Sequence, residues 1–448
     1  MSYKKRKLYF MKRKRVFWAV IIISVSFLSG CNGLGSVADL ATAPQGTAEM
    51  KELNLTLKNL IGDMVLRYPI SGDNRNAINL VDLTGSGAQD IVVTAVPSAP
   101  ADGLHLYIIT KGAGGYELFK DIPCSGTDVE SIDFMDLTGG KSLEIVLGTR
   151  LLNSENKLLA IYSLADENAV FEKAYTTMTA GTHPKDEIPM LFCTLLNREK
   201  TTAEGYLVFN KYGEIKDHAS CSLNSAVSSY GPVIFSVLAE KNSTPAFFIN
   251  EHLSESIISV EIVSFNGSEL INHTMDTNGN MLFEDFLART STIYSQDINN
   301  DGTVETPRPT GITSLPGTPA DPKRLIEWYV FNGKSFDHSS YTVINMPGRY
   351  YIKFPENWAD NIRFRSDVAE SALVFYYIEK EGFAEDLFII DCFDEKQWNS
   401  VKNEGWTLIK SYSDRKYAVK FYPAENAKIK ITLEELRERF VTATIMQR

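Results

Sequence analysis

A repeated pair of strands joined by an acidic, glycine-rich turn constrains this chain more than any other feature. Residues 78–95 (INLVDLTGSGAQDIVVTA) recur as residues 132–149 (IDFMDLTGGKSLEIVLGT), so Asp82 and Asp136 occupy matching positions 54 residues apart. The runs IVVTA and IVLGT are β-branched and almost continuously apolar, which is typical of strands buried on both faces. The repeat therefore predicts packed β-sheets with a polar turn between two strands of each unit.

A second repeated pattern consists of an aromatic-containing strand, a short polar turn and another strand. It occurs five times, starting at Leu104, Leu158, Gly205, Ser256 and Leu325. The units lie roughly 45 to 65 residues apart, a spacing that fits a four-stranded propeller blade and exceeds that of helical repeats. Residues 62–340 show little helical periodicity. We therefore expect a mainly β fold in which residues 49–340 form a β-propeller of about five four-stranded blades.

From residue 341 to residue 448 the pattern changes to strands that alternate with helical stretches, which predicts a small α+β domain. A helix is expected near Asp394, around Trp398. A second helix is expected after Thr432, which has the residue type of an N-cap and is followed three positions later by Glu435. The apolar residues assigned to one face of this helix are Leu433, Leu436, Phe440 and Val441. Strands are expected at 350–354, 361–365, 372–379, 387–393, 407–411 and 417–422.

The N-terminal residues predict a targeting segment. Eight Lys and Arg residues and no acidic residue occur in the first 30 positions, followed by a twelve-residue apolar run from Phe17 to Leu28. That run has the length of a signal-peptide core and is too short to span a bilayer comfortably. Residues 1–30 are therefore interpreted as a signal peptide.

The residues Leu28-Ser29-Gly30-Cys31 then resemble the bacterial lipoprotein signal. This resemblance implies that Cys31 becomes the mature N-terminus and carries a diacylglycerol, which would hold the protein on the outer face of the cell membrane. Residues 31–48 then form a lipidated, flexible tether. The alternative is an ordinary signal peptide or short membrane anchor that happens to contain this cysteine.

The remaining charge and cysteine content exclude several classes of function. Beyond residue 30 the chain has 37 Lys and Arg residues against 56 Asp and Glu residues, and such a surface repels phosphate backbones. We expect no nucleic-acid partner. Four further cysteines, Cys124, Cys193, Cys221 and Cys392, include no C-x-x-C pair, and the sequence does not decide their disulfide pairing.

Residues 297–305 (DINNDGTVE) form the best candidate for a chemical site. Gly302 is suited to a sharp turn in the middle of this segment. The oxygen ligands that it offers are Asp297, Asn299, Asp301, the Thr303 carbonyl and Glu305. Calcium prefers such a ring of hard oxygens, so we predict a structural calcium site. The alternative is a bare hairpin turn, which Asp-Gly favours on conformational grounds alone.

These acidic turns resemble the FG-GAP/VCBS repeat family, which is known from integrin heads and from bacterial surface lipoproteins. The resemblance implies a β-propeller that binds calcium in strand-flanked loops. Two related turns are weaker metal candidates, at Asp82, Thr84, Ser86 and Asp90 and at Asp136 and Glu144. The units near Leu195 and Leu238 have lost the acidic turn. Residues 354–358 and 374–377 resemble a small α+β module found in lipoproteins of Gram-positive bacteria.

No catalytic motif accompanies this architecture. The six His residues lack zinc-ligand spacing, and neither a nucleophile elbow nor a phosphate-binding loop occurs. We therefore expect a non-enzymatic binding module at the cell envelope, anchored by lipid and directed to an envelope protein or a glycan. Two alternatives remain open. One is an accessory or assembly factor of an envelope machine, and the other is an extracellular enzyme acting on polysaccharide or peptidoglycan.

Overall fold

The computed structural model describes residues 48–98, 103–112, 114–185, 187–240, 243–290, 293–309, 325–359, 361–367, 371–379 and 384–442. The chain divides into two compact units, Met1–Asp63 and Met64–Arg448. In the first unit the described structure is helix α3 (Ala48–Ile61), in which Leu57 is buried and Leu55 is exposed. The sequence analysis did not predict this helix. The signal peptide, Cys31 and nearly all of the tether lie outside the described residues.

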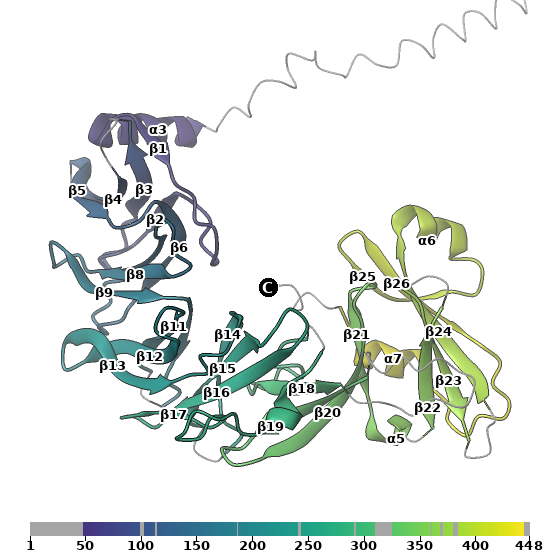
Figure 1. The fold of residues 1–448 in the computed structure, drawn as a ribbon. Helices are drawn as coiled ribbons and strands as arrows, with labels where there is room; N and C mark the ends of the chain where they lie inside the picture. Colours follow the sequence, from purple (N-terminus) through teal and green to yellow (C-terminus); the bar gives the residue numbers. More distant parts are fainter. Residues whose placement is uncertain are drawn as a thin grey trace, which may run out of the picture. The chain divides into compact units, whose positions relative to one another are not determined.

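The second unit consists of six antiparallel sheets that follow one another along the chain (Figure 1). The first sheet contains β1 (Met64–Leu66), β2 (Ile78–Val81), β3 (Asp90–Pro97), β4 (Leu104–Gly112) and β5 (Gly115–Cys124). The second contains β6 (Asp128–Met135), β7 (Glu144–Arg150), β8 (Lys157–Tyr162) and β9 (Ala169–Tyr175). The third contains β10 (Thr177–Thr182), β11 (Pro189–Asn197), β12 (Thr202–Lys211) and β13 (Glu214–Ser222). The fourth contains β14 (Ser229–Val237), β15 (Pro245–His252), β16 (Ile258–Phe265) and β17 (Leu270–Asn272).

The fifth sheet is assembled from distant parts of the chain. It contains β18 (Glu305–Pro309), β19 (Leu325–Phe331), β20 (Phe336–Asn345), β21 (Tyr350–Phe354) and, next to β21, β27 (Phe440–Thr442). The sixth sheet has the order β22 (Ile362–Ser366), β23 (Leu373–Ile378), β24 (Ala384–Asp394), β26 (Arg415–Phe421) and β25 (Thr407–Tyr412). The helices are α4 (Glu284–Leu287), α5 (Glu356–Ala359), α6 (Glu395–Val401) and α7 (Leu433–Arg439).

Successive sheets pack face to face, and each neighbouring pair encloses one apolar cluster. The first strands of the third and fourth sheets, β10 and β14, lie beside each other, as do their last strands, β13 and β17. Such a series of four-stranded meanders is the blade arrangement of a β-propeller. Each cluster contains apolar residues from both of the sheets that enclose it. One such pair from each cluster, in chain order, is Ile108 with Leu147, Leu159 with Val208, Phe192 with Phe247, Phe248 with Phe331, and Ile352 with Phe375.

The predicted fold class is therefore confirmed: five blade-like sheets are followed by a small α+β region. Each of the five strand–turn–strand patterns forms the two neighbouring strands expected of it, from β4–β5 to β19–β20. Residues 340 and 341, where the sequence places a domain boundary, both lie inside β20. The lost acidic turn of the third unit was predicted near Leu195, but Leu195 lies inside β11. The matching connection of the third sheet precedes that strand.

The C-terminal elements agree closely with their sequence signals. Asp394 caps α6 in a capping box with Gln397, and the side chain of Thr432 accepts a hydrogen bond from the backbone N–H of Glu435 at the start of α7. One detail was wrong. Phe440 and Val441 belong to β27 and not to the last helix, because the backbone turns extended at Phe440.

Candidate functional site

The three acidic turns share one hydrogen-bonding pattern. The aspartate at the first position accepts backbone N–H groups from the fifth and sixth positions: Asp82 from Ser86 and Gly87, and Asp297 from Asp301 and Gly302. Asp136 does the same with Gly139, Gly140 and Lys141. The sixth position has positive φ in all three turns, +84° at Gly87, +71° at Lys141 and +90° at Gly302. The first carboxylate therefore closes each turn on itself.

The acid at the last position of each turn is buried. Asp90, Glu144 and Glu305 accept the backbone N–H of Leu83, Leu137 and Ile298, at 3.1, 2.8 and 3.0 Å. Each is the first residue of a strand, so its carboxylate ties the start of that strand to the beginning of the turn. This contact explains why an acid recurs at this position even where the other oxygen positions differ.

The third turn carries the largest concentration of negative charge. Burial, together with the charges of Asp301 and Asp297, raises the pKa of Glu305 to about 7, although hydrogen bonds from Ile298 and Ser339 oppose the shift. None of these three carboxylates forms an ion pair with a basic side chain among the described residues. The amide Nδ2 of Asn299 instead donates to Asp301 at 2.9 Å and to Glu305 at 2.7 Å.

The predicted calcium ligands thus lie on one turn but do not converge on one point. Among the described residues, no three His, Cys, Asp or Glu side chains are grouped closely enough to hold a metal ion as they stand. A cation here would require the Asn299 amide to rotate so that its oxygen replaces its nitrogen. The Thr303 N–H donates to Asp301 at 2.8 Å, and the Thr303 backbone is also bridged to Val237.

In the first turn the hydroxyls act within the turn. Thr84 donates to Ser86 at 2.8 Å and to Asp82 at 3.3 Å, and the hydrogen bond from Gly87 is the largest of the effects that set the pKa of Asp82 below its usual value. In the second turn burial raises the pKa of Glu144 despite the hydrogen bond from Leu137. Both turns are held by their own contacts.

A polar recess of about 160 Å³ lies between the second and third sheets, next to the loop between β1 and β2. That loop covers the edge of β6, because the N–H groups of Ile70 and Ser71 donate to the carbonyls of Val129 and Glu130 at 3.2 and 2.7 Å. The residues of the recess that matter here are Ser71, Glu130, Ser131, Lys157, Tyr175 and Thr177. The sequence analysis identified none of them.

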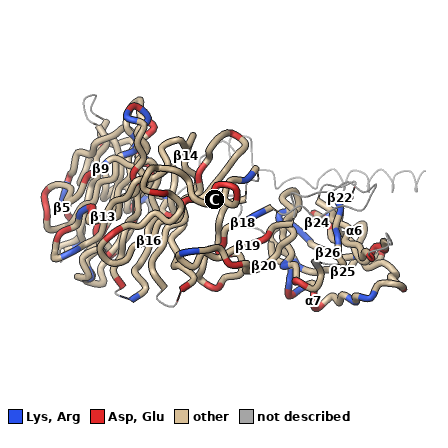
Figure 2. The backbone as a smooth tube through the Cα atoms, turned by 60° about the horizontal axis from the view of Figure 1, so that its bottom comes forward, with Lys and Arg blue, Asp and Glu red and all other residues tan. Residues whose placement is uncertain are grey.

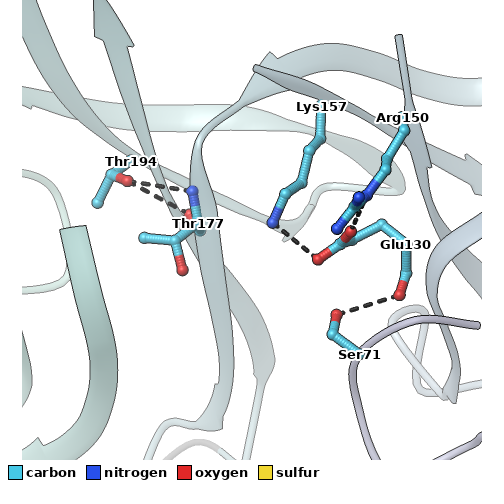
Figure 3. A network of polar contacts seen from close by, with 6 residues as sticks. All are labelled: Ser71, Glu130, Arg150, Lys157, Thr177 and Thr194. Atoms are coloured by element: carbon cyan, nitrogen blue, oxygen red, sulfur yellow. Dashed lines mark hydrogen bonds and ion pairs between the residues drawn. The ribbon is translucent and has the colours of Figure 1, made fainter. Parts of the chain in front are cut away.

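Glu130 is the centre of the charge network in this recess (Figure 3). Its side chain is 7% exposed, and its two carboxylate oxygens bind Arg150 Nε at 2.7 Å and Lys157 Nζ at 2.8 Å. Burial alone would raise the pKa of Glu130, but the hydrogen bonds from Lys157 and Arg150 outweigh it, so the pKa is lowered. Glu130 is therefore ionised and doubly paired, an arrangement that suits positioning and not proton transfer.

The same recess holds two buried hydroxyls that are close to each other. Apart from one another, Tyr175 Oη and Ser131 Oγ have no hydrogen-bond partner within the described part of the chain. Lys157 Nζ lies 5.7 Å from the centre of the Tyr175 ring. Asp133, on the same strand as Glu130 and Ser131, also lines the recess. Burial raises the pKa of Asp133, although Asn74 donates to it at 3.2 Å. Two buried hydroxyls with no partner apart from one another, beside a paired charge, form a site that can receive hydrogen bonds from a bound group.

Gly148 keeps this recess open, and its replacement by alanine should destabilise the protein. A Cβ at Gly148 would lie 2.3 Å from Tyr175 Oη and 2.7 Å from Ser131 Oγ, which forces a buried ring to move. We expect a loss of about 2 kcal/mol in the free energy of unfolding, measured by urea denaturation. Gly140→Ala is the matched control, since its nearest atom would be 3.5 Å away. Equal losses in both variants would contradict the described packing.

Other features predicted from the sequence have the following outcomes. All four described cysteines are free thiols, and burial raises the pKa of Cys124 to about 11 and those of Cys193 and Cys221 to about 12. Within the described ranges no helix is long and apolar enough to cross a membrane. Figure 2 shows acidic and basic positions interspersed over the sheets, mainly at strand ends and turns.

Comparison with known proteins adds no assignment of function. No family model and no curated protein matches this chain. Among solved structures it is similar to the Dos1 propeller, with 10% identity and a TM-score of 0.32 over 68% of this chain and 66% of that one, just under two thirds. It is also similar to Chaetomium thermophilum Sqt1, with 9% identity and a TM-score of 0.31 over 70% of this chain and 73% of the other. The six antiparallel sheets themselves define the fold.

Proposed function

We propose that this protein is a non-enzymatic binding module that Cys31 anchors by lipid to the outer face of a bacterial cell membrane. One observation carries the non-enzymatic assignment. The buried carboxylate of the polar recess, Glu130, is neutralised by two cations and has a lowered pKa. A general acid or base at neutral pH needs a raised or intermediate pKa, so this group orients a ligand and does not exchange protons with it.

The recess defines the kind of group that such a partner would insert. Its volume of about 160 Å³ is well below the roughly 300–1,000 Å³ of pockets that enclose whole small molecules. It therefore suits one polar side chain of an envelope protein or one sugar unit of a glycan. The hydroxyls of Ser131 and Tyr175 and the ammonium of Lys157 supply the hydrogen-bonding groups.

Crosslinking on intact cells, followed by pull-down through a C-terminal tag, tests this proposal. Thr179 lines the recess, so Thr179→Arg should abolish recovery of the partner, while Thr182→Arg at the exposed end of the same strand should not. Cys31→Ala should release the protein from the membrane fraction. Equal recovery in both arginine variants would reject the recess as the binding site. A change in the abundance of another envelope protein, without capture of a ligand, would favour an accessory factor.

Calcium is proposed as a structural ion of the third acidic turn. Asp297, Asp301 and Glu305 place three carboxylates on one turn, and no described basic side chain pairs with them. Such uncompensated charge favours a divalent cation with oxygen ligands. With a Kd on the order of 0.1 mM, calcium at millimolar concentration would stabilise the fold by about 1.4 kcal/mol.

The thermal stability with and without calcium provides the measurement. Calcium is added here to the folded, chelator-treated protein, without refolding, so that only an exposed site responds. We expect it to raise the Tm of the wild type, and Asp297→Ala to lose this increase, because the first carboxylate both closes the turn and faces the ion. Asp136→Ala is the control at the matching position of the second turn and should keep the response. A response of the folded Asp297→Ala protein to added calcium would reject the third turn as the responding site.

A further inference from the structure

Two glutamates face the apolar layer between the third and fourth sheets. Glu251 on β15 lies directly opposite Tyr230 on β14 and Ser259 on β16. Glu261 lies opposite Ile249, two residues from Glu251, so the two carboxyl groups are diagonal neighbours on the same face of the sheet. Every residue of β16 is buried, so these polar groups occupy positions that a propeller blade normally fills with apolar side chains.

These polar groups are buried and largely unpartnered. Glu251, Ser259 and Glu261 are each 0% exposed. Within the described part of the chain, both carboxylate oxygens of Glu251, Oε2 of Glu261, Ser259 Oγ and Tyr230 Oη have no hydrogen-bond partner. The backbone N–H of Asn224 donates to Glu261 Oε1 at 2.7 Å, and the side-chain amides of Asn224 and Asn272 lie close enough to Glu251 and Glu261, respectively, to lower their pKa values. Buried polar oxygens are rarely left in this state in folded proteins, which indicates a missing ligand.

A basic side chain does not fill this role. Arg289 lies near enough for its charge to act on Glu251, but its Nε and Nη1 donate to the carbonyls of Ile293 and Leu287, at 3.1 and 3.0 Å, its Nη2 has no hydrogen-bond partner among the described residues, and it forms no ion pair with either glutamate. Burial raises the pKa of both glutamates, and the charge of Glu261 raises that of Glu251 further, although the charge of Arg289 opposes the shift of Glu251. Without a cation, burial of two negative charges side by side is strongly unfavourable.

We propose that Glu251 and Glu261 bind a calcium ion between the third and fourth sheets, with Ser259 and Tyr230 as further oxygen ligands. Two carboxylates balance the charge of a divalent ion, and all of the available ligand atoms are hard oxygens. Calcium tolerates irregular geometry, whereas magnesium requires a near-ideal octahedron and retains water. Zinc is disfavoured because, among the described residues, no third His, Cys, Asp or Glu joins the pair.

Metal content measures this site directly, and the Asp297→Ala background separates it from the third acidic turn. The full-length protein is unfolded in chelator, refolded with calcium, desalted and analysed for bound calcium per chain. We expect Asp297→Ala to retain one calcium, and its combination with Glu251→Gln or with Glu261→Gln to retain none. Glu269→Gln, at an exposed position before β17, is the matched control and should keep the ion. Because the site is buried, the ion should also resist removal by chelator from the folded protein.

The alternative is a protonated glutamate pair with no metal. In that case the Asp297→Ala protein refolded with calcium would contain none, and refolding with or without calcium would give the same Tm. Either result would overturn the proposal. Circular dichroism checks that each glutamine variant is folded. We expect these variants to fold, because glutamine can form hydrogen bonds at these buried positions without carrying a charge. A folded variant that keeps the calcium would also overturn it. If calcium does not bind at the third acidic turn, the calcium content of the Asp297→Ala variants still tests the buried site.

Discussion

Replacement of Trp328 by alanine is expected to lower the free energy of unfolding by about 4 kcal/mol. Trp328 on β19 is 0% exposed and packs with Ile298, Ile326 and Tyr351 in the core of the fifth sheet. Its indole Nε1 also donates to Thr342 Oγ1 at 2.7 Å. The alanine variant therefore creates a large cavity and leaves a buried hydroxyl without its donor. Urea denaturation followed by circular dichroism measures the loss.

Trp328→Phe separates the two contributions. Phenylalanine keeps much of the apolar volume but removes the hydrogen bond to Thr342, so we expect a loss of about 2 kcal/mol. If alanine cost less than about 1 kcal/mol, the packing described for the fifth sheet would be incorrect.

Replacement of Lys157 by methionine is expected to cost about 3 kcal/mol at pH 7. Methionine keeps the side-chain length but leaves the buried Glu130 carboxylate with Arg150 as its remaining cation, and loss of one partner of a buried pair is strongly destabilising. The pKa of Glu130 is lowered in the folded state, so the stabilisation from its ion pairs is present above the unfolded pKa near 4.5. It disappears as the pH falls through the lowered folded pKa. The difference between variant and wild type should therefore shrink towards pH 3.

Lys173→Met is the matched control for this prediction. Lys173 also pairs with two acids, Glu204 and Asp217, but their side chains are 42% and 38% exposed. Pairs of that kind contribute little, and we expect a loss below about 1 kcal/mol. Urea denaturation at pH 7 and at pH 3 measures both variants. Equal losses for Lys157→Met and Lys173→Met at pH 7 would show that the burial of Glu130 has no energetic consequence.

The fold was predictable because its signals are local. Each strand–turn–strand pattern, such as the one from Leu104, contains alternating or continuously apolar strands and a polar turn within about twenty residues. The acidic turns were equally visible, since the glycine at position 302 and the acids around it are adjacent in the chain. The capping box at Asp394 is local in the same way.

The polar groups of the candidate sites were not predictable, because they depend on strand register and sheet packing. Nothing in the sequence distinguishes Glu130 from the many other acidic residues. Its partner Lys157 is 27 residues away along the chain and lies on a different strand. Glu251 and Glu261 interrupt apolar runs, which is a usable signal, but their shared face follows from the pairing of β15 with β16. Helix α3 was missed although Leu53, Leu57 and Leu60 have helical spacing, because the segment from residue 49 onwards was assigned to the β-propeller.

The pairing of β27 with β21 has a mechanical consequence. Tyr350, Tyr351 and Ile352 pair with Thr442, Val441 and Phe440, so the whole segment from α5 to α7 leaves the fifth sheet and returns to it. Tension applied at the C-terminal end would reach the hydrogen bonds of this short ladder before it reached the sixth sheet. The hydrogen bonds between β21 and β27 therefore bear the force first, and the α+β region is not stretched until they break.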